Sequence, residues 1–564
     1  MAFKVLSITR FNGGISIGDK ETITSVYNQN GLNSSWRFGY GVNIHDEPSK
    51  FSALPKSLNV LSGAYGAGIV LQDELRWIRD GYPWINNVFA YGSTGRVYQE
   101  DAAGNWTYIH TVPNSVGNGM EVFNDYLYCV GDTTISRYGP LDGTPTWSDS
   151  WQTGLNSTNA LGFAPCLVFS TGLAIGHGNS VGFLSNSLTP GFTTFTAYTV
   201  GNVIVYSGQY WRCILAYTTG NATTITPDID TTHWAAYTSS TAPVQWTVAA
   251  IQLPSGVNIT SLCRIEQYLA IGTTGSTSIF DNENGYIFMW DGSSPYFNFF
   301  NNIEQGSCNA LVNYRNQPLS INGSQGIIYL GYDPFIKVHQ LPKLPISGAV
   351  QVYPGAVTSW KGKVYIGFGA RSIDPNFVRG VYSWGSKVNA YPDALTCDFL
   401  ASTGNYGPTV QITACTGMGN SLYIGWRDGS TCGIDKVTYT NQFQSKVRMD
   451  YLIFDDGRIA QDKKADTFQI YHSNLNPGES ISIYYRSNRT DTPGFAYLTT
   501  PVYTHTYSSA DLEPNITRWS PATTDGPRFY ELEIGVSIQT TGGTTPYVYG
   551  MSMKYNDLTE EGAI

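Results

Sequence analysis

Two short acidic stretches, DNENG at 281–285 and DDG at 455–457, come closest to a metal site in this chain. Carboxylate and amide oxygens suit Ca²⁺, but an EF-hand loop needs such ligands at set positions over about twelve residues. Neither stretch has that spacing. We therefore interpret both as polar turns and expect no metal and no cofactor.

Patterns for hydrolytic and nucleotide chemistry are missing as well. The chain has no HExxH and no GxxxxGK[ST]. Asp398 and Glu304 are one example of a carboxylate pair for glycoside hydrolysis, but the sequence does not fix their separation. The histidines are dispersed, among them His110, His177, His339, His472 and His505. We predict that the protein is not an enzyme.

A recurring phrase points instead to a repeated structural unit. CRIEQYLAIG (263–272) and TSWKGKVYIG (358–367) each place a polar or glycine-containing kink before β-forming residues and a glycine. Similar phrases occur at 122–131, 167–176 and 416–425, with looser copies at 83–92 and 313–323. The closing glycines are Gly92, Gly131, Gly176, Gly272, Gly323, Gly367 and Gly425.

The spacing of these glycines predicts a β-propeller. The intervals are 39, 45, 96, 51, 44 and 58 residues, and four-stranded blades repeat at about 40–50 residues. Each blade buries its two faces only by stacking against neighbours, so we expect six to eight blades. We interpret each phrase as a turn followed by an inner strand, with the glycine allowing close approach near the axis. The alternative is an array of β-sandwiches.

Composition supports an all-β class and limits the partners. Aromatic and β-branched residues alternate with polar ones, and no long window has helical periodicity. The net charge of −10 and the lack of a Lys/Arg-rich run argue against a nucleic-acid grip. The N-terminus has no apolar signal region, no run is long enough to span a membrane, and the eight cysteines lack disulfide or zinc spacing. We expect synthesis in a reducing cytoplasm.

The doubled interval contains a segment of different character. The order of aromatic, glycine and threonine residues over 197–237 resembles the small chitin-binding family of carbohydrate-binding modules. The matching residues are Tyr198, Gly201, Val203 or Val205, Tyr206, Gly208, Tyr210, Tyr217, Thr218, Pro227 and Trp234. The family usually has paired tryptophans where this chain has Ala216 and Tyr217.

The resemblance implies both a core and a sugar-binding surface for this module. It places Tyr206, Tyr210 and Trp234 in the core. It makes Tyr217, Trp211 and Tyr198 the candidates for stacking on a sugar ring. The partner that the resemblance implies is a host surface glycan.

The C-terminal region alternates at period two between NPGE, DTPG and TDGP turns, which predicts a β-sandwich followed by an acidic tail. The predicted organisation is an N-terminal strand segment and start of the propeller (1–82), first blades (83–191), the inserted module (192–245), further blades (246–445) and the sandwich with its tail (446–564).

The opening phrase ITRFNGGIS (8–16) resembles the openings of structural proteins of tailed bacteriophages, and the architecture resembles that of tail nozzle proteins. The resemblance implies a homo-oligomeric ring, with a hexamer favoured, located in the virion tail after synthesis in the host cytoplasm. Its partners would be an adaptor, fibres and viral DNA that passes through without specific binding. Two alternatives are a tail adhesin that binds host glycan through the module, and a polysaccharide-degrading propeller enzyme.

Overall fold

The computed structural model describes most of the chain between residues 3 and 558. Apart from gaps of one to three residues, the ranges left undescribed are 12–21, 24–35, 45–48, 63–68, 73–87, 114–118, 157–163, 187–191, 193–196, 199–202, 219–225, 237–243, 276–284, 332–335, 341–349, 371–378, 387–392, 488–500, 522–526 and 559–564. The described residues form strands and one 3₁₀ turn, Pro354–Ala356. The all-β prediction is confirmed. No helix among the described residues is both long and apolar enough to cross a membrane.

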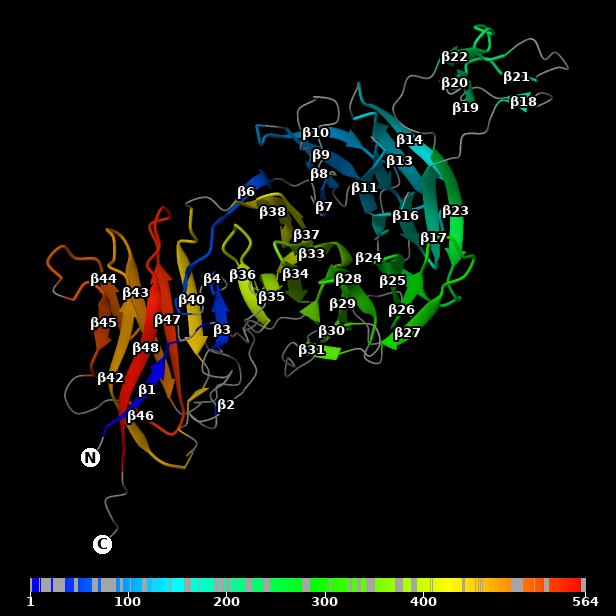
Figure 1. Cartoon of the computed structure of the whole chain (residues 1–564). Helices are drawn as coiled ribbons and strands as arrows, with labels where there is room; N and C mark the ends of the chain where they lie inside the picture. Colours follow the sequence, from blue (N-terminus) through cyan, green and yellow to red (C-terminus); the bar gives the residue numbers. More distant parts are fainter. Residues whose placement is uncertain are drawn as a thin grey trace.

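Seven four-stranded antiparallel blades make up the larger part of the described structure (Figure 1). Blades 1 to 3 are β7 (Ile69–Gln72), β8 (Val88–Tyr91), β9 (Arg96–Glu100), β10 (Trp106–Thr111); β11 (Gly119–Phe123), β12 (Tyr126–Val130), β13 (Thr134–Gly139), β14 (Thr146–Thr153); and β15 (Cys166–Phe169), β16 (Gly172–His177), β17 (Ser180–Asn186), β23 (Val244–Gln252). Blades 4 and 5 are β24 (Asn258–Ile265), β25 (Tyr268–Thr274), β26 (Gly285–Trp290), β27 (Phe299–Ile303); and β28 (Cys308–Tyr314), β29 (Gln317–Asn322), β30 (Ile327–Leu330), β31 (Ile336–Gln340). Blade 6 is β33 (Val357–Trp360), β34 (Lys363–Ala370), β35 (Gly380–Gly385) and β36 (Ala394–Phe399), with β32 (Val350–Gln351) also on β34.

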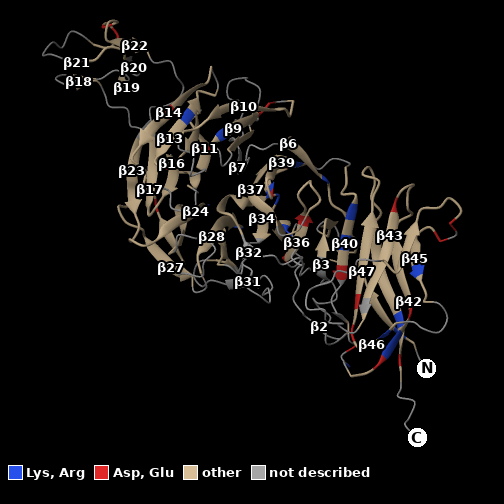
Figure 2. Ribbon diagram, turned by 180° about the vertical axis from the view of Figure 1, so that it is seen from behind, with Lys and Arg blue, Asp and Glu red and all other residues tan. Residues whose placement is uncertain are grey.

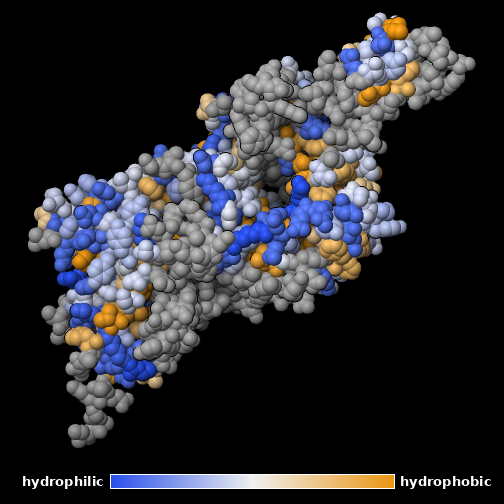
Figure 3. Space-filling model, viewed as in Figure 1, coloured by the Kyte–Doolittle hydropathy of each residue, from blue (hydrophilic) through white to orange (hydrophobic). Residues whose placement is uncertain are grey.

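Blade 7 closes the propeller with a strand from the other end of the chain. It combines β37 (Val410–Met418), β38 (Ser421–Asp428) and β39 (Thr431–Thr438) with β6 (Ser57–Ser62), which pairs antiparallel with β39. The first strands of successive blades contact one another in order, and β37 contacts β7. The ring of blades is therefore closed, and its space-filling surface is hollowed at the centre (Figure 3).

The hydrophobic core lies between blades. One cluster joins Phe169 and Val181 of blade 3 to Ile259 and Ile271 of blade 4, all fully or nearly fully buried. Equivalent clusters join blades 2 and 3, 4 and 5, 5 and 6, and 6 and 7. Because each sheet buries apolar side chains on both faces, each blade is stabilised by the two blades beside it.

The repeated phrase forms the hairpin and second strand of each blade. The second strand is an interior strand of each four-stranded sheet, and the first strands contact one another from blade to blade. Close approach at the glycines does occur, between blades. A Cβ atom on Gly272 would lie 2.6 Å from Cys308 Sγ of the next blade, and one on Gly367 would lie 2.3 Å from Ile412 Cγ2.

The other phrase glycines vary in setting. Gly176 would place a Cβ 2.7 Å from Ile259 Cγ2 of the next blade. Gly425 lies within β38, Gly131 directly follows β12, and Gly323 follows β29 with a positive φ of 64°. Gly92 lies outside the described residues. A β-bulge opposite the second strand recurs in β24, β28 and β37, so the blades share more than a glycine.

A two-sheet sandwich packs at the N- and C-terminal end of the molecule (Figure 1). One sheet contains β1 (Lys4–Ile8), β48 (Val548–Asp557), β42 (Lys463–His472), β45 (Ile516–Trp519) and β46 (Arg528–Phe529). The other contains β44 (Tyr503–Thr506), β43 (Ser480–Ser487), β47 (Leu532–Gln539), β40 (Lys446–Tyr451) and β3 (Trp36–Tyr40), with β41 (Ile453–Phe454) and β2 (Thr22–Ile23) at one end. The N-terminal strands β1 and β3 thus belong to the sandwich together with residues beyond 446.

The sandwich and the propeller share one sheet. Strand β3 pairs antiparallel with β40 of the sandwich and parallel with β36 of blade 6 at Tyr40 and Cys397. The short pair β4 (Val42–Asn43) and β5 (Ser52–Ala53) follows, and β6 then enters blade 7. The first sixty residues therefore tie the two parts together before the first blade begins.

Candidate functional site

The inserted segment forms two small sheets between the third and fourth strands of blade 3. These are β18 (Ala197–Tyr198) with β21 (Tyr217–Thr218), and β19 (Val203–Tyr206) with β20 (Gln209–Cys213) and β22 (Trp234–Ala236). They lie apart from the blades, beyond β14 and β23 (Figure 1). Their own small core contains Tyr198, Ile204, Cys213 and Trp234.

Tyr198 belongs to this core, which corrects its assignment as a sugar-stacking residue. Its ring is 6% exposed, stacks on Phe192 at 6.0 Å between centroids, and meets Trp234 edge-on at 5.0 Å. Tyr198 is therefore packed among module side chains and is not available to stack on a sugar ring. Trp234 is buried, at 1% exposure, as the resemblance implies.

The other predicted module residues lie in or beside the same small sheets. Trp211 is partly buried against the same core, which leaves only part of its indole for a ligand. Tyr206 is partly buried and meets Phe192 edge-on. The backbones of Tyr210 and Tyr217 lie in β20 and β21, while their side chains are outside the described part of the molecule. The large hydrophobic side chains that the described module exposes are aliphatic: Ile214 (47%), Leu215 (51%) and Ile229 (68%).

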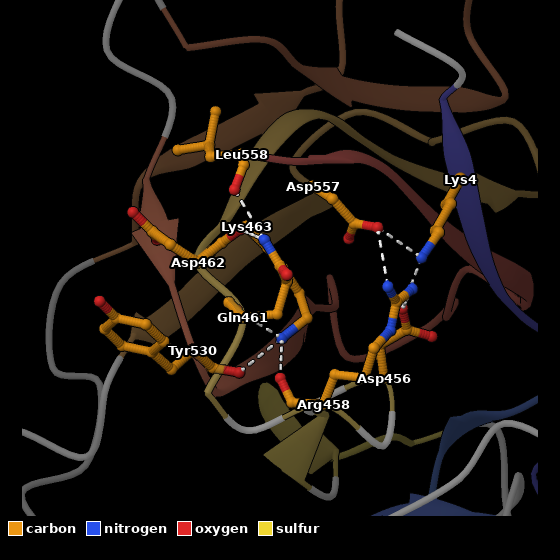
Figure 4. Close-up of polar contacts among 9 residues, drawn as sticks. All are labelled: Lys4, Asp456, Arg458, Gln461, Asp462, Lys463, Tyr530, Asp557 and Leu558. Carbon is orange, nitrogen blue, oxygen red and sulfur yellow. Dashed lines mark hydrogen bonds and ion pairs between the residues drawn. The ribbon is translucent and has the colours of Figure 1, made fainter. Parts of the chain in front are cut away.

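A charged cluster ties the chain termini into the sandwich (Figure 4). Lys4 Nζ lies 3.0 Å from Asp456 Oδ2 and 2.7 Å from Asp557 Oδ2. The Arg458 guanidinium contacts the same two oxygens at 3.0 and 3.2 Å. Burial raises the pKa of Asp456, although cations and the Tyr555 hydroxyl surround it. Two cations face two carboxylates, so the cluster has the charge balance of a structural clasp.

Lys463 extends this cluster into the interior. Its ammonium is buried and donates to the carbonyl oxygens of Arg458 at 2.8 Å, Gln461 at 2.9 Å and Tyr530 at 3.1 Å. Gln461 in turn donates to the Leu558 carbonyl at 2.7 Å. Three carbonyls use the three donors of an ammonium, which is how a lysine is accommodated away from water. These contacts fix the turn before β42 against β46 and β48.

A second polar chain joins the two sheets of the sandwich. His472 Nδ1 lies 2.7 Å from the Ser473 carbonyl, and His472 Nε2 lies 2.9 Å from Thr517 Oγ1. The same hydroxyl lies 3.1 Å from His505 Nδ1, and His505 Nε2 bonds Asp511 Oδ2. Hydroxyl, imidazole and carboxylate have the order of a nucleophilic triad. Thr517 is fully buried, however, so no substrate reaches its oxygen.

The number of protons on each group fixes which atoms donate and which accept along this polar chain. The Ser473 carbonyl accepts from His472 Nδ1, so the Thr517 hydroxyl donates to His472 Nε2 and accepts from His505 Nδ1. His505 Nε2 bonds Asp511, whose pKa is held below its usual value by the Glu513 backbone amide and by His505.

Two other candidates from the sequence are structural. Asp398 is fully buried, accepts from Thr396 Oγ1 at 2.6 Å and lies 3.6 Å from Lys363 Nζ, and burial raises its pKa. It is shielded from a polysaccharide, and Glu304 lies outside the described residues. His177 accepts from the Asn156 amide at 3.0 Å, so its Nε2 donates to the Val248 carbonyl at 2.7 Å.

No group of three or more His, Cys, Asp or Glu residues in the described part of the chain is arranged to hold a metal ion. The stretch 281–284 lies outside that part, as do residues 455 and 457. The eight cysteines form no disulfide with one another. Sequence reasoning missed the polar clusters of the sandwich, because their members are far apart: Lys4 and Asp456 are separated by 452 positions.

Comparison with known proteins finds no matching family model and no matching curated protein. Among solved structures, 309 chains match. They include the WD40 β-propeller domain of Doa1 (TM-score 0.36, 10% identity, 68% of this chain and 97% of that one) and YCF48 bound to D1 peptide (0.35, 10%, 68% and 98%). The designed Ika8 protein is also similar (0.33, 11%, 67% and 99%). These likenesses concern the propeller fold and say nothing of activity.

Proposed function

We propose that this protein is a structural subunit of a bacteriophage tail, a nozzle-like element that forms a homo-oligomeric ring around the path of the genome and carries fibres. The proposal takes its phage context from the resemblance of the sequence, and its mechanical role from the fold.

The observation that carries the mechanical role is the sheet shared by the propeller and the sandwich. Strand β3 is hydrogen-bonded to β40 on one side and β36 on the other, and the following residues close blade 7. A hinge at this junction would require breaking ladder hydrogen bonds, which neighbouring domains joined only by a linker do not have to do. The two parts therefore suit a stiff wall element.

The charge distribution fits a wall that nucleic acid passes without binding. The chain has 32 Lys and Arg against 42 Asp and Glu. Figure 2 shows few blue (Lys, Arg) or red (Asp, Glu) segments on the propeller strands and more on the sandwich. Phosphate contacts by Lys and Arg supply most nonspecific DNA affinity, so a net-acidic wall favours passage.

Immunogold electron microscopy of virions that contain this chain tests the proposal. Antibody raised against the purified chain is expected to label the tail. Label confined to the capsid, or absent from virions that are positive for the chain by mass spectrometry, would refute it.

A tail adhesin that binds host glycan through the inserted module is the second candidate, supported by the position of the module away from the blades. A glycan array that compares the native chain with Tyr217→Ala tests it. Loss of binding supports the role, and an unchanged profile removes Tyr217 from it.

A further inference from the structure

An exposed tyrosine ring on the sandwich is held in position by its neighbours. Tyr471 is 41% exposed on β42, and its hydroxyl donates to Gln469 Oε1 at 2.8 Å. The residue paired with it on β48 is Gly550, and a Cβ atom there would lie 3.8 Å from Tyr471 Cδ2. The ring therefore lies against the backbone of the neighbouring strand, where no side chain displaces it. A ring held in this way loses little conformational entropy when a ligand covers it.

A row of polar side chains crosses the same face of the sheet beside this ring. Phe468 and Ile470 point into the sandwich core, so Gln469 and Tyr471, which alternate with them, point outward. The strand register aligns Gln469 with three other residues that are at least partly exposed: Ser7 of β1, Ser552 of β48 and Arg518 of β45. Hydroxyl groups donate and accept hydrogen bonds, and the amide nitrogen and the guanidinium donate them. The row lies two residues, about 7 Å, from Tyr471 along β42, so one ligand can contact both the row and the ring.

The charges that border this face balance. Arg518 Nη1 lies 3.6 Å from Glu513 Oε2. Lys554 of β48 and Asp466 of β42 are both exposed, on adjacent strands. Two cations therefore accompany two carboxylates, and the face favours neither an anionic nor a cationic ligand.

These features together fit an uncharged glycan. One face of a sugar ring carries C–H groups that pack on an aromatic ring, while its hydroxyl groups need hydrogen-bond partners when they leave water. Tyr471 provides the aromatic ring, and the polar row provides the partners. We propose that the outer face of the sheet formed by β1, β48, β42 and β45 binds an uncharged glycan, with a sugar ring stacked on Tyr471 and its hydroxyl groups bonded by Gln469 and Arg518.

Two other occupants suit this face less well. A nucleic-acid base can stack on a tyrosine, but the phosphates are bound by an excess of Lys and Arg that this face lacks. The core of a protein interface is depleted in charge and enriched in apolar side chains. Here the exposed rings of Tyr471 and Tyr549 adjoin serine, glutamine and charged side chains. A glycan matches both the ring and the polar row.

The inference goes beyond the tail role proposed above and does not depend on it. Failure of the immunogold labelling would leave glycan binding standing, and a chain that binds no glycan can still build a tail. The inference also differs from the adhesin alternative, because the inserted module lies at the opposite end of the molecule from the sandwich (Figure 1).

A printed array of uncharged hexose and N-acetylhexosamine glycans, probed with the purified full-length chain, tests the inference. The array also carries polyuronate and thymidine oligonucleotides as charged comparators, and titration calorimetry gives the Kd for the tightest glycan. Tyr471→Ala removes the ring, whereas Tyr471→Phe keeps it and loses only the hydroxyl. Tyr503→Ala is the matched control, because Tyr503 is 40% exposed on β44 of the other sheet. Tyr217→Ala reports on the module, and circular dichroism confirms that each variant is folded.

We expect the native chain to bind at least one uncharged glycan, and Tyr471→Ala to weaken that binding at least about tenfold, as for other ligands whose rings stack on an aromatic side chain. Tyr471→Phe, Tyr503→Ala and Tyr217→Ala should all bind more tightly than Tyr471→Ala. A native chain that binds no uncharged glycan would overturn the inference, as would binding confined to the charged comparators. It is also overturned if Tyr471→Ala binds like the native chain, or if Tyr503→Ala or Tyr217→Ala loses as much binding as Tyr471→Ala.

Discussion

Substitution of Gly367 by alanine tests whether the repeated glycines exist to let neighbouring blades meet. The added Cβ would lie 2.3 Å from Ile412 Cγ2 and 3.0 Å from Ala356 Cβ. Ile412 is 1% exposed and Ala356 fully buried, so neither neighbour moves freely. Overpacking of this kind costs about 1–3 kcal/mol of unfolding free energy. We expect Gly367→Ala to destabilise the propeller by that amount in urea unfolding.

The control and a double mutant make the prediction specific. Gly543→Ala adds a methyl where no atom lies within 4 Å, and it reports the effect of alanine on the unfolded chain. Ile412→Ala alone should cost about 2–5 kcal/mol because it opens a cavity. In the double mutant the new methyl enters that cavity. The double mutant should therefore lose less unfolding free energy than the sum of the losses in the two single mutants. A Gly367→Ala variant as stable as Gly543→Ala, or strict additivity, would refute the packing argument.

Three further perturbations address the sandwich. Lys463→Met leaves the buried carbonyls of Arg458, Gln461 and Tyr530 without their donor, and we expect a loss of about 3 kcal/mol or more in unfolding free energy, measured against Lys464→Met at a half-buried position. Burial lowers the pKa of His472, which lies beside His505 and Asp511, from 6.5 to about 4. As the pH falls, His472 is therefore protonated in the unfolded chain before it is protonated in the native chain. The unfolding free energy should fall by up to about 3 kcal/mol between pH 6.5 and pH 4. His472→Gln should remove that share of the pH dependence, and parallel curves for the two proteins would contradict it. Nitrogen-15 NMR near neutral pH should show neutral His472 protonated at Nδ1, with Nε2 accepting from Thr517. In a Thr517→Val variant the Nε2 resonance should shift because it loses its donor, and an unchanged resonance would exclude this hydrogen bond.

The blades could be predicted because each one contains a local sequence pattern that indicates a hairpin. A hairpin with a following glycine, as in 263–272 and 358–367, needs only neighbouring residues to form. The alternating apolar pattern then requires a second sheet on each face. The seven described blades, with β6 closing the ring, resolve a count that the sequence alone left between six and eight.

Long-range pairing could not be predicted in the same way. Nothing in SLNVLS (57–62) indicates that it completes a sheet with residues 433–437, or that KVLSI (4–8) pairs with β48. Such choices depend on which edges remain open once the blades are built. Tyr198 shows the same limit at the level of a side chain, because its burial depends on Phe192 and Trp234 closing over it.

Cryo-electron microscopy of the assembled purified protein tests the central claim most directly. We predict closed rings with an open axial channel, in which every copy holds its propeller and sandwich in one fixed relation through β3. Dispersed single copies, with the two parts at variable angles, would contradict it.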